Sequence, residues 1–287
     1  MSAKFSHHFA DVNGIFIHYV KQGNGPRLVV LLHGFPEFWY SWRYVIPALS
    51  EQYTVVAPDM RGFNDSDKPD GVEAYKTEYV IKDIKGLVEY LGFEKAVIVG
   101  HDWGGAVAWH FATAYPEMTE KLAILNCPHP KLMLKAATSD VKQILKSWYI
   151  FFFQLPQLPE FLVERFLPDF FKKAMKEHMV NPQNLSDDDL MQYVQAFRQK
   201  GSLTATMNYY RASLQLGLSK DLVYRKVKCP VRVIWGKEDQ ALNASMNDDL
   251  HTVVDGPFEV KYLSPCSHWT QIDRPDDVNR LLLEFIG

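Results

Sequence analysis

The residue with the most evident chemical role is an aspartate at the centre of the segment Gly100-His101-Asp102-Trp103-Gly104-Gly105. The β-branched run 97–99 precedes this segment, and helical spacing begins at Ala106. Small residues on both sides of one central residue allow a strand to turn sharply into a helix, which holds the central side chain clear at the sheet edge. The sequence therefore predicts a nucleophile elbow that carries a carboxylate in place of the usual serine hydroxyl.

Two further residues complete a possible catalytic set with Asp102. Asp239 follows the apolar run 231–235, and His268 lies in the loop after the run 260–263. A nucleophile, an acid and a histidine in this chain order form a hydrolytic triad on an open α/β sheet. All three residues follow the carboxyl ends of predicted strands, where such sheets place their sites. We therefore expect the three side chains to meet at one edge of the sheet.

A carboxylate nucleophile favours displacement at a saturated carbon over acyl hydrolysis. With a reference pKa of about 4, Asp102 is ionised at neutral pH and needs no base before it attacks. Attack on an ester or amide would give a reactive mixed anhydride, which disfavours an esterase. Attack on an alkyl carbon gives an ordinary ester, and His268, oriented by Asp239, can then activate water to hydrolyse it. The backbone N–H groups of Phe35 and Trp103 are predicted to form the oxyanion hole.

The leaving group decides the substrate. A departing halide needs N–H donors such as an indole or an amide, whereas an opened epoxide needs donors that protonate an alkoxide. A phenol with a pKa of about 10 donates well to a developing alkoxide, so a pair of tyrosines above the nucleophile would serve. The segments Trp148-Tyr149 and Asn208-Tyr209-Tyr210-Arg211 offer such tyrosines.

The elements that must position these residues alternate between strands and helices. Apolar runs without alternation are typical of strands that are covered on both faces, and one helix with regular apolar spacing ends before Gly92. The alternation predicts a mainly parallel, doubly wound α/β sheet. The predicted strands are at 15–20, 28–32, 53–57, 97–99, 122–125, 231–235 and 260–263.

The pattern changes after Pro130, because residues 131–218 have helical periodicity and no convincing strand. Four prolines divide this region into short pieces, and one helix is predicted to begin at Ser186-Asp187-Asp188-Asp189. The run 148–153 is expected to form a pocket wall and the core of this region. We predict an α/β core from residues 1–130 and 219–287, interrupted by an all-helical cap, or lid, at 131–218.

Composition limits the partners and the compartment. The chain has 287 residues and a net charge of −3, which argues against nucleic acid or an anionic membrane as its main partner. The odd count of three cysteines, Cys127, Cys229 and Cys266, without metal-ligand spacing indicates reduced thiols in a cytoplasmic protein. Neither a secretory signal nor a run long enough to span a bilayer is predicted, and we expect no metal and no organic cofactor.

The chain resembles the epoxide hydrolases of the α/β-hydrolase superfamily over nearly its full length. The resemblance rests on His33-Gly34-Phe35-Pro36-Glu37, Trp39-Tyr40-Ser41-Trp42-Arg43, the segment around Asp102, and Ser267-His268-Trp269-Thr270-Gln271. It implies that two lid tyrosines polarise the epoxide oxygen, and these fall on Tyr149 and on Tyr210, with Tyr209 as the alternative to Tyr210. It also implies a small hydrophobic epoxide and water as substrates, with Phe35 and Trp103 lining the substrate site.

Two other functions remain open. A haloalkane dehalogenase shares the fold and the aspartate nucleophile, but that family typically has Asn where this chain has Phe35. A haloacid-type dehalogenase is similar but carries Arg after the nucleophile, where this chain has Trp103. A catalytically silent binding protein on the same fold is disfavoured because Asp102, Asp239, His268 and both tyrosine segments are present. The sequence does not specify the epoxide, its stereochemistry or the oligomeric state.

Overall fold

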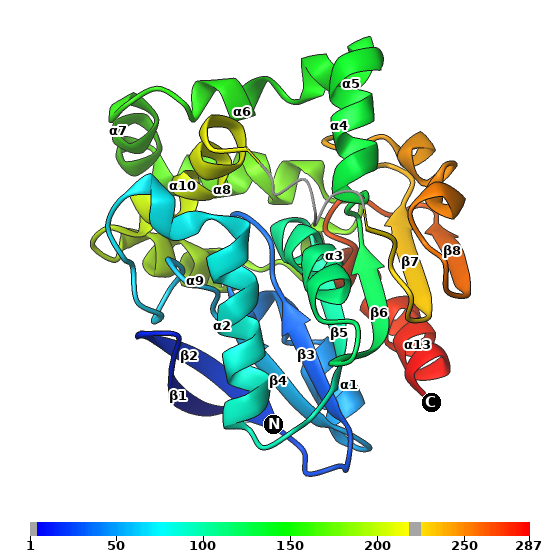
Figure 1. Cartoon of the computed structure of the whole chain (residues 1–287). Coiled ribbons are helices and arrows are strands. Elements are labelled where there is room, and N and C mark those ends of the chain that lie inside the picture. The colour runs from blue at the N-terminus through cyan, green and yellow to red at the C-terminus, as the bar shows by residue number, and fades with distance from the viewer. Residues whose placement is uncertain (1–4, 218–224) are drawn as a thin grey trace.

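A computed structural model describes residues 5–217 and 225–287 of the chain and places an eight-stranded sheet at its centre (Figure 1). The predicted mostly parallel α/β sheet is confirmed. Its strands are β1 (Ser6–Val12), β2 (Ile15–Gln22), β3 (Leu28–Leu32), β4 (Thr54–Pro58), β5 (Ala96–His101), β6 (Thr119–Leu125), β7 (Val231–Gly236) and β8 (Phe258–Leu263).

The strand order is β1-β2-β4-β3-β5-β6-β7-β8. Strands β1 and β2 pair antiparallel, as do β2 and β4, and every later pairing is parallel. Strands β3, β4 and β5 are buried along their whole length, because helices cover both faces of the sheet. This burial is the reason that their sequences are unbroken apolar runs. The carboxyl ends of the parallel strands therefore lie along one edge of the sheet, where the site is expected.

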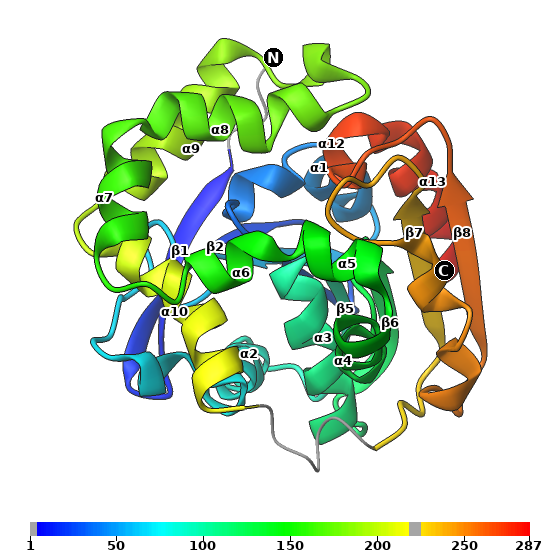
Figure 2. The same ribbon diagram turned by 90° about the horizontal axis from the view of Figure 1, so that it is seen from above.

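Helices cover the sheet in two layers and extend above its carboxyl edge. Helices α2 and α3 lie on one face and α1 and α13 on the other, as the two views in Figures 1 and 2 agree. In the described part of the chain, no helix is long and apolar enough to cross a membrane. The helices are α1 (Val45–Ser50), α2 (Thr77–Tyr90), α3 (Trp103–Ala114), α4 (Pro130–Ser139), α5 (Val141–Lys146), α6 (Trp148–Phe152), α7 (Leu158–Arg165), α8 (Leu167–Ala174), α9 (Asp187–Arg198), α10 (Ser202–Gln215), α12 (Thr270–Asp273) and α13 (Pro275–Ile286).

The described residues between β6 and β7 contain helices α4 to α10 and no strand. Helix α9 begins as its sequence predicts, since Ser186 and Asp189 form a capping box. Proline is among the first residues of α4, α7 and α8, where its missing N–H costs no helical hydrogen bond. The predicted boundary between residues 218 and 219 lies outside the described residues.

The turn from β5 into α3 brings Asp102 to the edge of the sheet. Asp102 has φ 50° and ψ −121°, a backbone conformation that costs free energy in a residue other than glycine. The helix can follow so closely because Gly100 and Gly104 lack side chains. A Cβ on Gly104 would lie 2.2 Å from the carbonyl oxygen of Leu32, and one on Gly100 would lie 2.3 Å from the carbonyl oxygen of Gly104. The strained turn predicted from these small residues is thus present.

Candidate active site

Asp102 faces the loop that follows β3. Its Oδ1 atom accepts a hydrogen bond of 2.9 Å from the backbone N–H of Phe35. Gly34 makes this approach possible, because a Cβ at that position would lie 2.5 Å from the Cβ of Asp102. Trp103, the second residue predicted to supply an oxyanion N–H, is the first residue of α3 and directly follows Asp102. The backbone N–H of Phe35 therefore holds Oδ1 of Asp102, while Oδ2 is directed away from Phe35.

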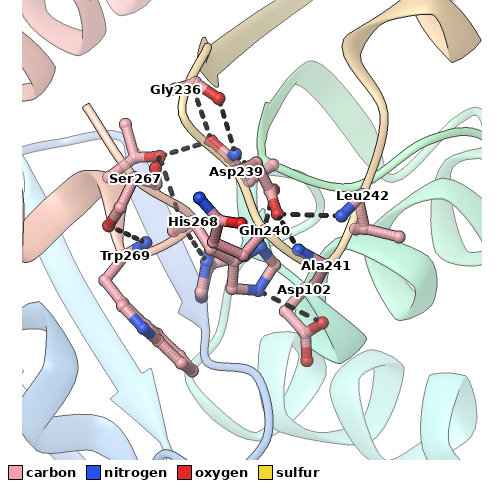
Figure 3. A network of polar contacts seen from close by, with 12 residues as sticks. Asp102, Gly236, Asp239, Gln240, Ala241, Leu242, Ser267, His268 and Trp269 are labelled. Carbon is pink, nitrogen blue, oxygen red and sulfur yellow. Dashed lines mark hydrogen bonds and ion pairs between the residues drawn. The ribbon is translucent and has the colours of Figure 1, made fainter. Parts of the chain in front are cut away.

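The other oxygen of Asp102 faces His268, which lies between two carboxylates (Figure 3). The Nε2 atom of His268 is 3.5 Å from Oδ2 of Asp102, and Nδ1 is 2.7 Å from Oδ2 of Asp239. Asp239 is fixed in turn, because its Oδ1 accepts hydrogen bonds from the backbone N–H groups of Ala241 and Leu242. The structure thus brings together the three residues that the sequence singled out on three different loops.

The charges of Asp102, His268 and Asp239 stabilise one another. Burial alone would raise the pKa of Asp102, but the hydrogen bond and charge of His268, together with His101 and the N–H of Phe35, hold it below its ordinary value. Burial also opposes ionisation of Asp239, yet His268 and the amide of Asn126 hold its pKa low. Burial would lower the pKa of His268, but Asp239 and Asp102 raise it well above that of an ordinary imidazole. The free site therefore favours an imidazolium between two carboxylates.

Sequence analysis did not single out Asn126 among the polar groups that hold the triad in place. Asn126, after β6, donates to Oδ2 of Asp239 at 2.7 Å and accepts from the N–H of Gly236. Its place at the carboxyl end of a strand was the available signal. Buried Glu37 bonds to Nδ1 of His101 at 2.7 Å, and Nε2 of His101 bonds to the backbone oxygen of His268 at 2.9 Å. These contacts fix the loop that carries His268.

Two tyrosines from the helical segment between β6 and β7 line the same cavities as Asp102. Tyr149 of α6 and Tyr210 of α10 have ring centroids 5.9 Å apart, and Tyr210 also packs on Trp103 at 4.9 Å. Burial raises the pKa of both phenols above their ordinary value, and the charge of Asp102 acts in the same direction. Both phenols therefore remain protonated and can donate a hydrogen bond.

Tyr209 is differently placed. Its hydroxyl donates to the backbone oxygen of Arg61 at 2.9 Å, and its ring packs against Phe63 and Tyr75. Because this donor is already used within the protein, Tyr209 is less suited than Tyr210 to act on a substrate.

Two cavities reach the carboxylate of Asp102. Their volumes are about 230 and about 770 Å³, and Asp102, Tyr149 and Tyr210 line both. The larger cavity also contains Phe35 and His268 in its wall, whereas the smaller one is lined mainly by apolar residues of α3, α4 and α10. A substrate bound at Asp102 thus has space on both sides of the reacting atom.

The wall of the smaller cavity also includes His110 of α3, which sequence analysis did not single out. His110 is buried, and its Nδ1 atom has no hydrogen-bond partner among the described residues. Burial lowers the pKa of this imidazole to about 4, so the ring is neutral at physiological pH.

The described residues include one group that has the donor atoms for a metal ion, formed by His18, Asp59 and Asp65. His18 Nδ1 and Asp59 Oδ2 are already hydrogen bonded at 2.6 Å, and Asn64 donates to the same oxygen. The hydrogen bond between His18 and Asp59 connects β2 to the loop after β4. The group lies outside the two cavities and contributes no residue to their walls.

A family model described as the alpha/beta hydrolase fold matches residues 27–275 of the chain. The chain belongs to the α/β-hydrolase family. Within this family it is 41% identical to the AB hydrolase superfamily protein YfhM of Bacillus subtilis, over 97% of this chain and 96% of that protein. It is 39% identical to mouse Epoxide hydrolase 4, over 96% of this chain and 77% of that protein.

Solved structures agree with this placement in the α/β-hydrolase family. The epoxide hydrolase of Bacillus megaterium, in complex with an inhibitor, superposes with a TM-score of 0.84. The two chains are 30% identical, and the match covers 97% of this chain and 99% of the other. The chain therefore groups, within the α/β-hydrolase family, with proteins named epoxide hydrolases.

Proposed function

We propose that the protein is an epoxide hydrolase that converts epoxides to vicinal diols through a covalent ester on Asp102. The observation that carries the proposal is the pair of protonated phenols, Tyr149 and Tyr210, which line the same two cavities as Asp102. A carboxylate opposite two O–H donors suits a substrate whose leaving atom is an oxygen. The named relatives described above point to the same activity.

In the first step, Oδ2 of Asp102 attacks one carbon of the epoxide. This oxygen is the less tightly held one, because Oδ1 accepts a 2.9 Å hydrogen bond from the N–H of Phe35, whereas Oδ2 has a contact of 3.5 Å with Nε2 of His268. The new C–O bond forms as the ring C–O bond breaks, and Tyr149 and Tyr210 stabilise and protonate the alkoxide that results. Because the protein holds the carboxylate of Asp102 and the phenol donors of Tyr149 and Tyr210 around the bound epoxide, the displacement is effectively unimolecular.

In the second step, His268 removes a proton from water, and the resulting hydroxide attacks the carbonyl carbon of the Asp102 ester. Negative charge develops on Oδ1, where the N–H groups of Phe35 and Trp103 form the proposed oxyanion hole. The C–O bond to the substrate breaks and its oxygen takes the proton held by His268. The other proton of the attacking water returns to the tyrosine that protonated the alkoxide, so the diol leaves while the carboxylate and both phenols are restored. Asp239 orients His268 and stabilises the imidazolium.

We further propose that residues 131–218 act as a cap over a core formed by residues 1–130 and 219–287. Support comes from Tyr149 and Tyr210, which belong to α6 and α10 of the proposed cap and share their cavities with Asp102 of the core. A cap of this kind covers the reacting bond and excludes bulk water.

The proposal is tested by incubating the purified protein separately with a styrene-type epoxide and with a bromoalkane of similar size. We expect diol from the epoxide and no bromide from the alkane. Bromide release without diol formation would instead favour a dehalogenase, and turnover of neither substrate would favour a binding protein.

The two tyrosines give a prediction with an internal control. Tyr149→Phe and Tyr210→Phe are each expected to lower the rate of ester formation by about 10- to 100-fold, because each loses one donor to the alkoxide. Tyr209→Phe is the matched control and is expected to change this rate less than about threefold, at a cost of about 1 kcal/mol in stability from the lost bond to Arg61. Single-turnover kinetics measure the rate, and urea unfolding measures the stability. A larger loss of rate in Tyr209→Phe than in Tyr210→Phe would reverse the assignment.

Hydrolysis of the ester should depend on pH through His268. In the free enzyme two carboxylates raise the pKa of this imidazole, so it is protonated near neutral pH. Formation of the ester removes the charge of Asp102, and the pKa of His268 must then fall. Since only the neutral imidazole can accept the proton from water, the hydrolysis rate should rise with pH through this lower pKa and then level off. Rapid-quench measurements from about pH 5 to 9 test this, and a rate independent of pH would contradict His268 as the base.

A further inference from the structure

The outer surface of helices α5 to α7 is unusually apolar for an exposed surface. Six large side chains there are each more than half exposed, at 53–69% of their area, and they follow one another along the chain at short intervals. We call this surface the apolar cap face and define it by Val141, Leu145, Trp148, Phe151, Phe161 and Phe166. Extended apolar patches of this kind on a protein surface mark a site of interaction with a partner or a membrane.

The apolar cap face lies on one edge of the molecule. In Figure 1 helices α5, α6 and α7 follow one another along the edge opposite to β1 and β2. Figure 2 looks onto this edge and shows α6 near the middle, with α5 and α7 on either side. A single extended surface can therefore contact α5, α6 and α7 at the same time.

The charge of this region differs in sign from that of the rest of the chain. Residues 131–178 contain eight Lys and Arg and five Asp and Glu, which gives this segment a net charge of +3. The other residues together have a net charge of −6, so the whole chain has −3. Lys142, Arg165, Lys172 and Lys173 are exposed, and none of the four forms an ion pair with a described residue. Exposed aromatic side chains beside unpaired basic ones are typical of a surface that binds an anionic lipid interface.

The apolar cap face is also continuous with the candidate site. Leu145 and Trp148 belong to the face, being 69% and 64% exposed, and they also line the larger cavity that reaches Asp102 and His268. Lys173 lines the same cavity. A second copy of the chain seated on this face would cover the entrance, whereas a lipid surface would connect the entrance to a phase in which apolar compounds dissolve. This continuity favours a membrane over a protein partner.

We propose that the apolar cap face docks on the surface of an anionic phospholipid bilayer and turns the entrance of the larger cavity toward the lipid. Trp148, Phe151, Phe161 and Phe166 enter the headgroup region, and the basic residues beside them contact lipid phosphates. The proposal is for docking on the bilayer surface, since none of the described helices is long and apolar enough to cross a membrane. Delivery of an apolar epoxide from the lipid rests on the proposed function, but the docking itself does not.

The test is flotation of the purified full-length protein with two kinds of vesicles, one of phosphatidylcholine alone and one that also contains phosphatidylglycerol. We expect binding to the anionic vesicles that weakens at high salt. Phe151→Ser/Phe161→Ser should reduce it about tenfold or more, because two apolar contacts with the lipid are lost. Phe9→Ser/Phe16→Ser is the matched control and should bind like the wild type, since both residues are 54% exposed but lie on β1 and β2 at the opposite edge.

A second variant tests the charge. Lys142→Glu/Arg165→Glu should lose the preference for anionic over neutral vesicles, because two exposed basic residues on α5 and α7, helices of the face, are reversed. Circular dichroism and turnover of a small water-soluble epoxide show that each variant is folded. Because flotation uses no epoxide, its outcome is independent of whether the protein hydrolyses one. Three results would overturn the proposal: no binding of the wild type to either vesicle, equal binding of Phe151→Ser/Phe161→Ser, or a dimer in solution that this variant dissociates without any lipid binding.

Discussion

Replacement of Asp102 by alanine is expected to reduce diol formation by at least about 10⁴-fold, because no other carboxylate in the site can form the ester. Asp239 is the other acid near His268, but hydrogen bonds from Ala241, Leu242 and Asn126 occupy its oxygens. The loss should appear in ester formation as well as in steady-state turnover. Rapid-quench mass spectrometry of the protein measures the first, and diol release measures the second.

A backbone effect must be separated from the loss of the nucleophile. Asp102 has a positive φ, which alanine adopts less readily than asparagine. Asp102→Asn is therefore the matched control, since it keeps the shape of the side chain and an oxygen for the N–H of Phe35 while it removes the charge. Both variants should be inactive and folded by thermal unfolding, with intact mass used to verify that the amide persists. Multiple turnovers by Asp102→Ala would exclude a covalent route through this residue.

The sheet could be predicted from the sequence wherever burial on both faces leaves an unbroken apolar run. This condition holds for β3 and β5, whose predicted and observed positions agree. It fails for β1, which no apolar run indicated, because β1 is an edge strand with most of its residues exposed. A strand of that kind is specified by its partner β2 rather than by its own composition.

Chain order was sufficient to single out Asp102, Asp239 and His268, because parallel strands bring their carboxyl ends to one edge of the sheet whatever the details of packing. Chain order could not decide between Tyr209 and Tyr210. Neighbouring residues of a helix point about 100° apart, so the choice depends on how α10 is rotated against the core. In the structure α10 is rotated so that the hydroxyl of Tyr209 contacts the backbone oxygen of Arg61. The sequence alone does not show this contact.

Neither the net charge nor the apolar run 148–153 describes how charged and apolar side chains are distributed over the surface. The net charge of −3 argued against an anionic membrane, yet it conceals a basic segment at residues 131–178. The run 148–153 was expected to be pocket wall and core. This is wrong for Phe151, which is 60% exposed and lines neither cavity, whereas Trp148 lines the larger cavity although it is 64% exposed. On the short helix α6, Trp148 and Phe151 are three residues apart and exposed, whereas Tyr149 and Phe152 line the larger cavity, and the side chains on both faces are apolar.

His268→Gln is expected to separate the two chemical steps. Glutamine cannot take a proton from water, so the ester on Asp102 should form and then persist, while steady-state turnover falls by about 10³-fold or more. His268 also helps to keep the pKa of Asp102 low, so the first step should be measured near pH 8, where Asp102 remains ionised without that help. The expected observation is one equivalent of the epoxide bound covalently per protein as the ester, with a mass increase equal to the mass of the epoxide.

The position of the added mass is the decisive measurement. Proteolysis should place it on the peptide that contains Asp102, and the double variant Asp102→Ala/His268→Gln should show no addition at all. Asp239→Asn provides an intermediate case, because it leaves the imidazole in place but removes the carboxylate that orients it at 2.7 Å, and it should slow hydrolysis of the ester more than its formation. An adduct on Tyr149 or Cys127 in place of Asp102, or full turnover by His268→Gln, would contradict the proposed order of steps, since each requires a nucleophile or a base other than the ones that these loops bring together.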